Sequence, residues 1–172
     1  DAGVLRNHLF KCFENAAWLD DPARREALTT IVVVGGGPTG LETAGAMAEL
    51  SKYVLSKEYG SQLEGHVILV EMSDHLLDPY PPALRQAARR QLEDMGIEVI
   101  LGYQVVEAGE DHIRLENGRL IPTYTLVWVA GVRAASIADM LDVPLSKNNR
   151  VPVYPTLQVM GHEDIYVAGD MA

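Results

Sequence analysis

The sequence predicts an α/β fold of three layers, with a central parallel sheet, helices on one side and a β-meander on the other. Two patterns predict the sheet and its helices. Apolar runs of strand length alternate with segments of helical periodicity, as in strands joined by crossover helices. A glycine-rich turn also joins the first of these runs to a helix of small residues. The meander is predicted because three short segments with tight turns follow the third run, in place of a crossover helix.

Composition and length limit the class of protein. The 172 residues correspond to about one domain, and 48% hydrophobic and 22% charged residues are typical of a globular chain. A net charge of −10 argues against recognition of nucleic acid through a basic surface. Cys12 is the only cysteine, which excludes an internal disulfide and suits a reducing compartment. The chain has no long apolar run or signal peptide and does not begin with Met, so we expect a cytoplasmic piece of a longer protein.

Two helices are predicted at the start of the chain. In Gly3–Leu19, apolar residues recur at helical spacing, which indicates an amphipathic helix with Cys12 in its core-facing part. The Asp21-Pro22 pair favours a second helix that continues to Leu28, because Asp caps helices and Pro suits the first helical position.

The segment Ile31–Leu50 carries the strongest functional signal. Its buried strand leads into Gly35, Gly37 and Gly40, which match G-x-G-x-x-G between a strand and a helix. In that motif the first glycine makes a tight turn, the second lets a pyrophosphate approach, and the third allows close packing of helix on strand. Pro38 suits the first helical turn, and the helix N-terminus would offer N–H groups to phosphates. The alternative is an ordinary glycine-rich turn in an α/β core.

An acidic residue ends the second predicted strand, His66–Glu71. At this place in a dinucleotide fold, an acid accepts hydrogen bonds from the adenosine ribose hydroxyls. Glu71 favours NADH over NADPH, because a 2′-phosphate would meet like charge and residues 72–74 supply no Arg. Its distance from Gly40 exceeds the usual spacing of about 20 residues, which an insertion at 51–65, predicted as a helix extension and a surface loop, would explain. Alternatively, Glu71 is only a solvated strand end.

The later elements follow from the same patterns. They are a helix at Pro81–Gly96, a strand at Ile97–Leu101, meander strands at Val105–Ala108, His112–Leu115 and Arg119–Ile121, and strands at Thr125–Ala130 and Ile165–Asp170. Asn117-Gly118, before the last meander strand, is a strong hairpin signal.

This combination resembles the nicotinamide-binding domain of the pyridine nucleotide-disulfide oxidoreductases, the flavoproteins with two dinucleotide-binding domains. The resemblance is carried by VVVGGGPTGLETAGAMAEL, by WVAGV at Trp128–Val132, and by VPVYPTLQVMGHEDIYVAGDMA at the end of the chain. Within that family the chain is most similar to the type II (non-proton-pumping) NADH dehydrogenases. The resemblance implies a helical linker from a missing FAD domain at 1–30, a Rossmann-like NAD(H)-binding domain at 31–160, and a return strand towards the FAD domain at 161–172.

The resemblance also assigns candidate site residues. The pyrophosphate loop is Gly35, Gly37, Pro38, Thr39 and Gly40, the ribose acid is Glu71, the nicotinamide ring lies near Ala130 and Gly131, and the flavin is contacted by Gly169 and Asp170. Glu42 corresponds to a glutamate near the nicotinamide and the quinone pocket. It could equally be a carboxylate on the first helical turn that the helix dipole stabilises. No metal site is expected, because the five histidines are scattered: His8, His66, His75, His112 and His162.

The resemblance implies a function for the complete protein. NADH would pass a hydride to FAD, which is bound largely by segments outside this sequence, and the flavin would reduce a quinone. The complete protein would be an NADH dehydrogenase, peripheral on the inner face of the cell membrane, and this piece would bind NADH without turnover. Two alternatives remain: the NAD(P)H-binding domain of a disulfide, ferredoxin or nitrite reductase-type flavoprotein, and a non-catalytic NADH-binding module or redox sensor.

Overall fold

A computed structural model describes residues 2–60, 63–131 and 133–172. Residues 61–62 of the predicted surface loop and Val132 of the WVAGV run lie outside the described residues. The chain forms two compact units, Asp1–Ala130 and Gly131–Ala172, which are taken in turn.

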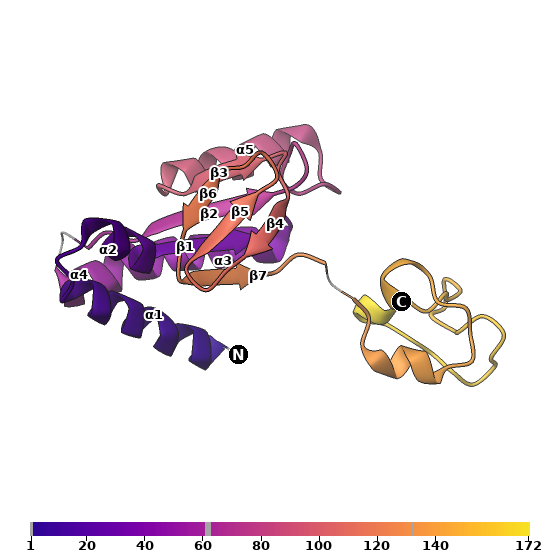
Figure 1. The fold of residues 1–172 in the computed structure, drawn as a ribbon. Helices are drawn as coiled ribbons and strands as arrows, with labels where there is room; N and C mark the ends of the chain where they lie inside the picture. The colour runs from indigo at the N-terminus through magenta and orange to yellow at the C-terminus, as the bar shows by residue number, and fades with distance from the viewer. Residues whose placement is uncertain (1, 61–62, 132) are drawn as a thin grey trace. The chain divides into compact units, whose positions relative to one another are not determined.

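A four-stranded parallel sheet is the centre of the first unit (Figure 1). Its strands, in spatial order, are β3 (Glu98–Leu101), β2 (His66–Glu71), β1 (Thr30–Val34) and β7 (Thr125–Trp128). Strand β1 pairs with β2 and β7, and Val32 lies beside Ile68 on one side and Leu126 on the other. All five residues of β1 are buried, as the run of β-branched residues predicts.

Helices cover one face of this sheet. They are α1 (Ala2–Ala17), α3 (Pro38–Leu50) and α5 (Pro82–Asp94), while α2 (Pro22–Thr29) packs beside α1. Leu9, Ala44 and Leu92, one from each covering helix, are buried in one cluster with Ile31 and Val33 of β1. Side chains of a strand alternate between its two faces, so these two β1 residues define the helical face.

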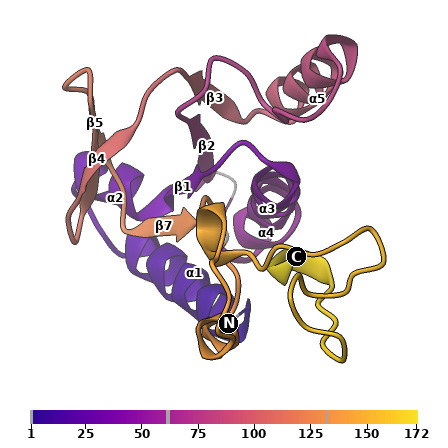
Figure 2. The ribbon, with the colours of Figure 1, turned by 90° about the vertical axis from the view of Figure 1, so that its right-hand side faces the viewer.

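The β-meander covers the other face. Its strands β4 (Val105–Ala108), β5 (His112–Leu115) and β6 (Leu120–Pro122) form an antiparallel sheet, with Gly118 in the left-handed region at the hairpin turn. Val32 and Ile68 of the central sheet share a second buried cluster with Ile113 of β5. Figure 2 shows β4 and β5 on one side of β1 and β2, with α3 and α5 on the other. The predicted three-layer α/β architecture is therefore confirmed.

A π-helix, η1 (Ser51–Leu55), and a short helix α4 (Ser56–Tyr59) extend α3. The buried Ser51 hydroxyl accepts a hydrogen bond from the Gly65 N–H at 2.9 Å. This bond ties the extension to the residue before β2, and the described residues 51–59 are helical, as the predicted helix extension requires.

The second unit has short helices and isolated bridges. Its described residues form the 3₁₀-helices η2 (Ser136–Met140), η3 (Lys147–Asn149) and η4 (Gly169–Met171). The predicted strand at Ile165–Asp170 is wrong, since Tyr166 makes only an isolated bridge with Gln158. Gly169 has a φ of +71° and begins η4, so extended backbone stops before the predicted end. Among the described helices, none has the length and apolarity to cross a membrane.

Candidate functional site

The candidate site lies at the carboxyl edge of the parallel sheet. Gly35 follows the end of β1, Glu71 ends β2, and Ala130 follows the end of β7. Because the strands are parallel, these three ends meet at one edge, and α/β sheets bind ligands outside the carboxyl ends of their strands. The structure thus brings together the predicted loop, the predicted ribose acid and Ala130.

Close backbone packing explains two of the three motif glycines. Gly35 has a φ of +124°, and a Cβ added there would lie 3.0 Å from the Ala130 nitrogen. A Cβ added at Gly40 would lie 1.7 Å from the Gly35 carbonyl oxygen, well inside contact distance. Gly40 therefore lets α3 start directly against the end of β1, as its place in the motif predicts.

The outer surface of the loop is open. An added Cβ at Gly37 would meet nothing within 4 Å, and Gly37, Pro38 and Thr39 are exposed. Gly37 caps α3 without a side-chain hydrogen bond, and Pro38 is in its first turn. The first turn of an α-helix presents N–H groups that have no partner within the helix. The backbone of Thr39 and Gly40 can therefore donate to a phosphate group placed on this surface.

Glu71 binds the glycine loop itself. One oxygen of its carboxylate accepts the Gly36 N–H at 2.5 Å, and the other accepts the Ser73 N–H at 2.8 Å. Gly36 packs against this side chain, because an added Cβ would lie 2.7 Å from the Glu71 Cγ. Each carboxylate oxygen can accept more than one hydrogen bond, so Glu71 can also accept bonds from ribose hydroxyls. Gly36 is not among the site residues predicted from the sequence, although it is the middle residue of three consecutive glycines.

The segment that follows Glu71 also packs against the glycine loop. Leu76 is buried, and the Leu77 N–H donates to the Gly36 carbonyl at 2.8 Å. Arg85 of α5 holds the next residues, since its guanidinium donates to the Tyr80 carbonyl at 2.5 Å and to the Asp78 carbonyl.

Glu42 lies beyond the first turn of α3, where a carboxylate would interact most strongly with the helix dipole. The first turn of α3 has no acidic residue, so the expected place of Glu42 on that turn is wrong, because Pro38 begins the helix and Glu42 falls in the second turn. Its exposed side chain lines a groove between α3 and α5, with Gly45 and Gln91. The proximity of Glu42 to nicotinamide and quinone stays a prediction.

The remaining predicted site residues belong to the second unit. Gly131 and Gly169 have positive φ values of +75° and +71°, and Asp170 is exposed in η4. Their assigned roles towards the nicotinamide ring and the flavin stay predictions.

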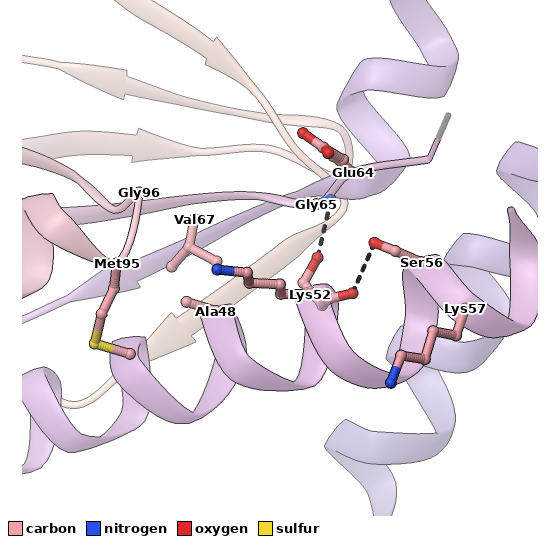
Figure 3. A pocket seen from close by; sticks show the side chains of 10 residues that line it. Ala48, Lys52, Ser56, Lys57, Glu64, Gly65, Val67, Met95 and Gly96 are labelled. Carbon is pink, nitrogen blue, oxygen red and sulfur yellow. Dashed lines mark hydrogen bonds between the residues drawn. The ribbon is translucent and has the colours of Figure 1, made fainter. Parts of the chain in front are cut away.

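A cavity of about 420 Å³ lies at the opposite edge of the sheet, lined by residues that include Ala48, Lys52, Gly65 and Met95 (Figure 3). Gly65 precedes β2 and Met95 follows α5, so this cavity is at the amino edge, away from the glycine loop. It therefore contributes nothing to the candidate site.

Other reactive side chains do not form a second centre in the described part of the chain. Cys12 is buried in the core, as predicted, and this burial raises the pKa of its thiol. No group of three or more His, Cys, Asp or Glu side chains among the described residues could hold a metal ion.

The parallel sheet, its glycine loop and the acid at the end of β2 define a Rossmann-like domain of the class that binds dinucleotides at this edge. The chain belongs to the pyridine nucleotide-disulphide oxidoreductase family, whose sequence profile matches residues 4–172.

Known relatives agree with this membership. The type II NADH:quinone oxidoreductase Ndh of Mycobacterium tuberculosis is 35% identical over 182 aligned positions, which cover 100% of this chain and 39% of the relative. The type II NADH:quinone oxidoreductase of Haemophilus influenzae is 34% identical over 86% of this chain and 34% of its own length. The solved structure of NDH2 from Plasmodium falciparum in complex with NADH has a TM-score of 0.80 at 19% identity, and covers 96% of this chain and 36% of that one. The chain thus spans about two fifths of the length of such relatives, and the structural likeness establishes the shared fold.

Proposed function

We propose that this chain is the NADH-binding domain of an FAD-dependent NADH:quinone oxidoreductase. The observation that carries the proposal is the contact between Glu71 and Gly36, which joins the ribose acid to the phosphate loop. The identity of about 35% to type II NADH:quinone oxidoreductases supports the choice of NADH and quinone as the substrates.

Different residues of the site bind the different parts of NADH. The α3 N-terminus and Gly37 receive the pyrophosphate, because the surface there is open and rich in N–H donors. Glu71 accepts hydrogen bonds from the ribose hydroxyls, and Ala130 and Gly131 border the nicotinamide ring. A ring placed there is oriented by backbone, and no side chain of this chain has to act as a general base.

The electron acceptors lie beyond this domain. FAD, contacted here by Gly169 and Asp170 and held mainly by segments outside this chain, would supply the hydride acceptor and the route of electrons to quinone. We place membrane contact, on the inner face of the cell membrane, in those same segments. This chain alone would bind NADH without turnover.

Calorimetric titration with NADH and with NADPH tests the proposal. We expect the complete protein to prefer NADH, and Glu71→Ala to weaken NADH binding by about 10- to 100-fold, as loss of a hydrogen bond to a charged group predicts. Glu64→Ala is the matched control, because Glu64 is an exposed acid at the amino edge of the sheet and should leave both affinities unchanged. Equal affinity of the wild-type protein for the two nucleotides would contradict the role given to Glu71.

A further inference from the structure

His75 lies between two carboxylates in the segment that follows Glu71. Its Nε2 is 2.7 Å from an Asp78 oxygen, and its Nδ1 also lies within hydrogen-bond distance of an Asp74 oxygen. Ionised carboxylates only accept hydrogen bonds, and a neutral imidazole has a single N–H. Both contacts together therefore require the doubly protonated, positively charged ring.

Leu76 and Leu77, which lie between His75 and Asp78 in the chain, contact the glycine loop. Leu76 is within contact distance of Gly36, since a Cβ added at Gly36 would lie 2.9 Å from the Leu76 Cδ2. Leu77 follows with its N–H bonded to the Gly36 carbonyl and has a positive φ of +53°, a backbone conformation that costs free energy in a branched residue. The hydrogen bonds of His75 to Asp74 and Asp78 join residues on either side of Leu76 and Leu77.

The charges around His75 favour its protonated form. Hydrogen bonds to Asp74 and Asp78 raise the pKa of His75 above the ordinary value of 6.5, and partial desolvation and the charge of Arg85 on α5 oppose the rise. The side chains of Asp74 and Asp78 are largely exposed, so solvent screens each pair and its energy is small.

We propose that His75 is a positioning residue for NADH, whose charged ring clamps Asp74 and Asp78 and holds the segment against Gly36, so that NADH binds more weakly once the ring loses its charge. This inference rests on the proposed function of the glycine loop.

The direction of the pH effect follows from the raised pKa of His75. A group whose pKa is raised by its folded partners keeps its full contribution below its ordinary value, here 6.5, and loses it as the pH rises through the higher folded value. Deprotonation leaves one of the two acids without its donor and adds net negative charge beside a site for an anionic dinucleotide. NADH affinity should therefore fall as the pH rises from 6.5 through the higher folded pKa of His75.

The test measures the dissociation constant of NADH across that pH range for the complete protein and three variants. For the wild type we expect the dissociation constant of NADH to rise about threefold with pH, which corresponds to the loss of one solvent-screened ion pair. His75→Gln should bind equally at all pH values, with the weaker affinity that the wild type has at high pH. Asp78→Asn, which removes the Nε2 partner at an exposed position, should move the transition to lower pH.

His112→Gln is the matched control. His112 on β5 also lies between two acids, 2.8 Å from an oxygen of Asp111 and 3.5 Å from an oxygen of Glu107, and its pKa is raised too, but it belongs to the meander. This variant should keep the wild-type pH profile. A pH profile that is the same in wild type and His75→Gln would overturn the inference while NADH binding itself persists. Absence of NADH binding in wild type at every pH would instead overturn the proposed function.

Discussion

Two glycines in α3 have opposite surroundings, so alanine at the two positions should change the stability of the protein in opposite directions. A Cβ at Gly40 would lie 1.7 Å from the Gly35 carbonyl oxygen, whereas a Cβ at Gly45 would lie 3.6 Å from the Met95 Cε, an ordinary contact. Gly40→Ala should lower the free energy of unfolding by about 1–3 kcal/mol through overpacking. Gly45→Ala should raise it by about 0.5–1 kcal/mol, because alanine loses less backbone entropy in a helix.

Urea unfolding followed by circular dichroism measures both changes, and NADH titration of the folded variants measures the site. Gly40→Ala should also weaken NADH binding, since backbone that must move to admit the methyl group belongs to the phosphate loop. If the two variants had the same stability, α3 would not approach β1 as closely as the structure shows.

The sequence motif predicted the packing role of Gly40 but not the bond between Glu71 and Gly36. The first follows from spacing along one strand–turn–helix unit. The second depends on the register of β1 against β2, in which Val34 lies beside Val70. Such a register between strands far apart in the chain is set by tertiary packing, so it cannot be read from local sequence patterns.

At the scale of elements, the N-terminus of α2 depends on one capping side chain. Asp21 accepts the N–H groups of Ala23 at 3.0 Å and of Arg24 at 3.4 Å, and Pro22 starts the helix. Asp21→Ala should lower the free energy of unfolding by about 1 kcal/mol, the usual value of an N-cap. The neighbouring exposed Asp20 makes no capping bond to α2, so Asp20→Ala changes the net charge equally and serves as the control. Thermal unfolding that showed equal losses for the two variants would assign the effect to charge and not to the cap.

The strands of the central sheet were predictable because their side chains are buried on both faces. Ile31–Val34 and the apolar part of His66–Glu71 are continuous apolar runs, and each has a parallel neighbour in the sheet. Ile165–Asp170 has a similar composition, but it lies in the second unit, where Tyr166 makes only one isolated bridge. Local composition gives the tendency to extend, whereas a strand also needs a partner.

At the scale of the whole molecule, each unit has its own buried apolar cluster. Three clusters lie within the first unit, and the fourth, which includes Ala138 and Val159, lies within the second. Ala130 ends the apolar run predicted as the strand Thr125–Ala130, but no boundary between units was predicted there. The boundaries of the NAD(H)-binding domain at 31–160, which the family resemblance implies, stay predictions. They differ from the division of the structure into two compact units at Ala130.

The separate clusters predict how a shortened chain behaves. Residues 1–130 contain the whole parallel sheet, its covering helices and the meander, so a chain that stops at Ala130 should unfold in one cooperative thermal transition. Residues 131–172 alone should show no such transition, because the segment is shorter than the roughly 50 residues of the smallest typical domains and its one small cluster offers little burial against the entropy of ordering. Circular dichroism melts of the two pieces and of residues 1–172 make the comparison. A gradual, non-cooperative melt of residues 1–130 would show that the sheet needs the second unit to fold, and would refute the independence of the two units.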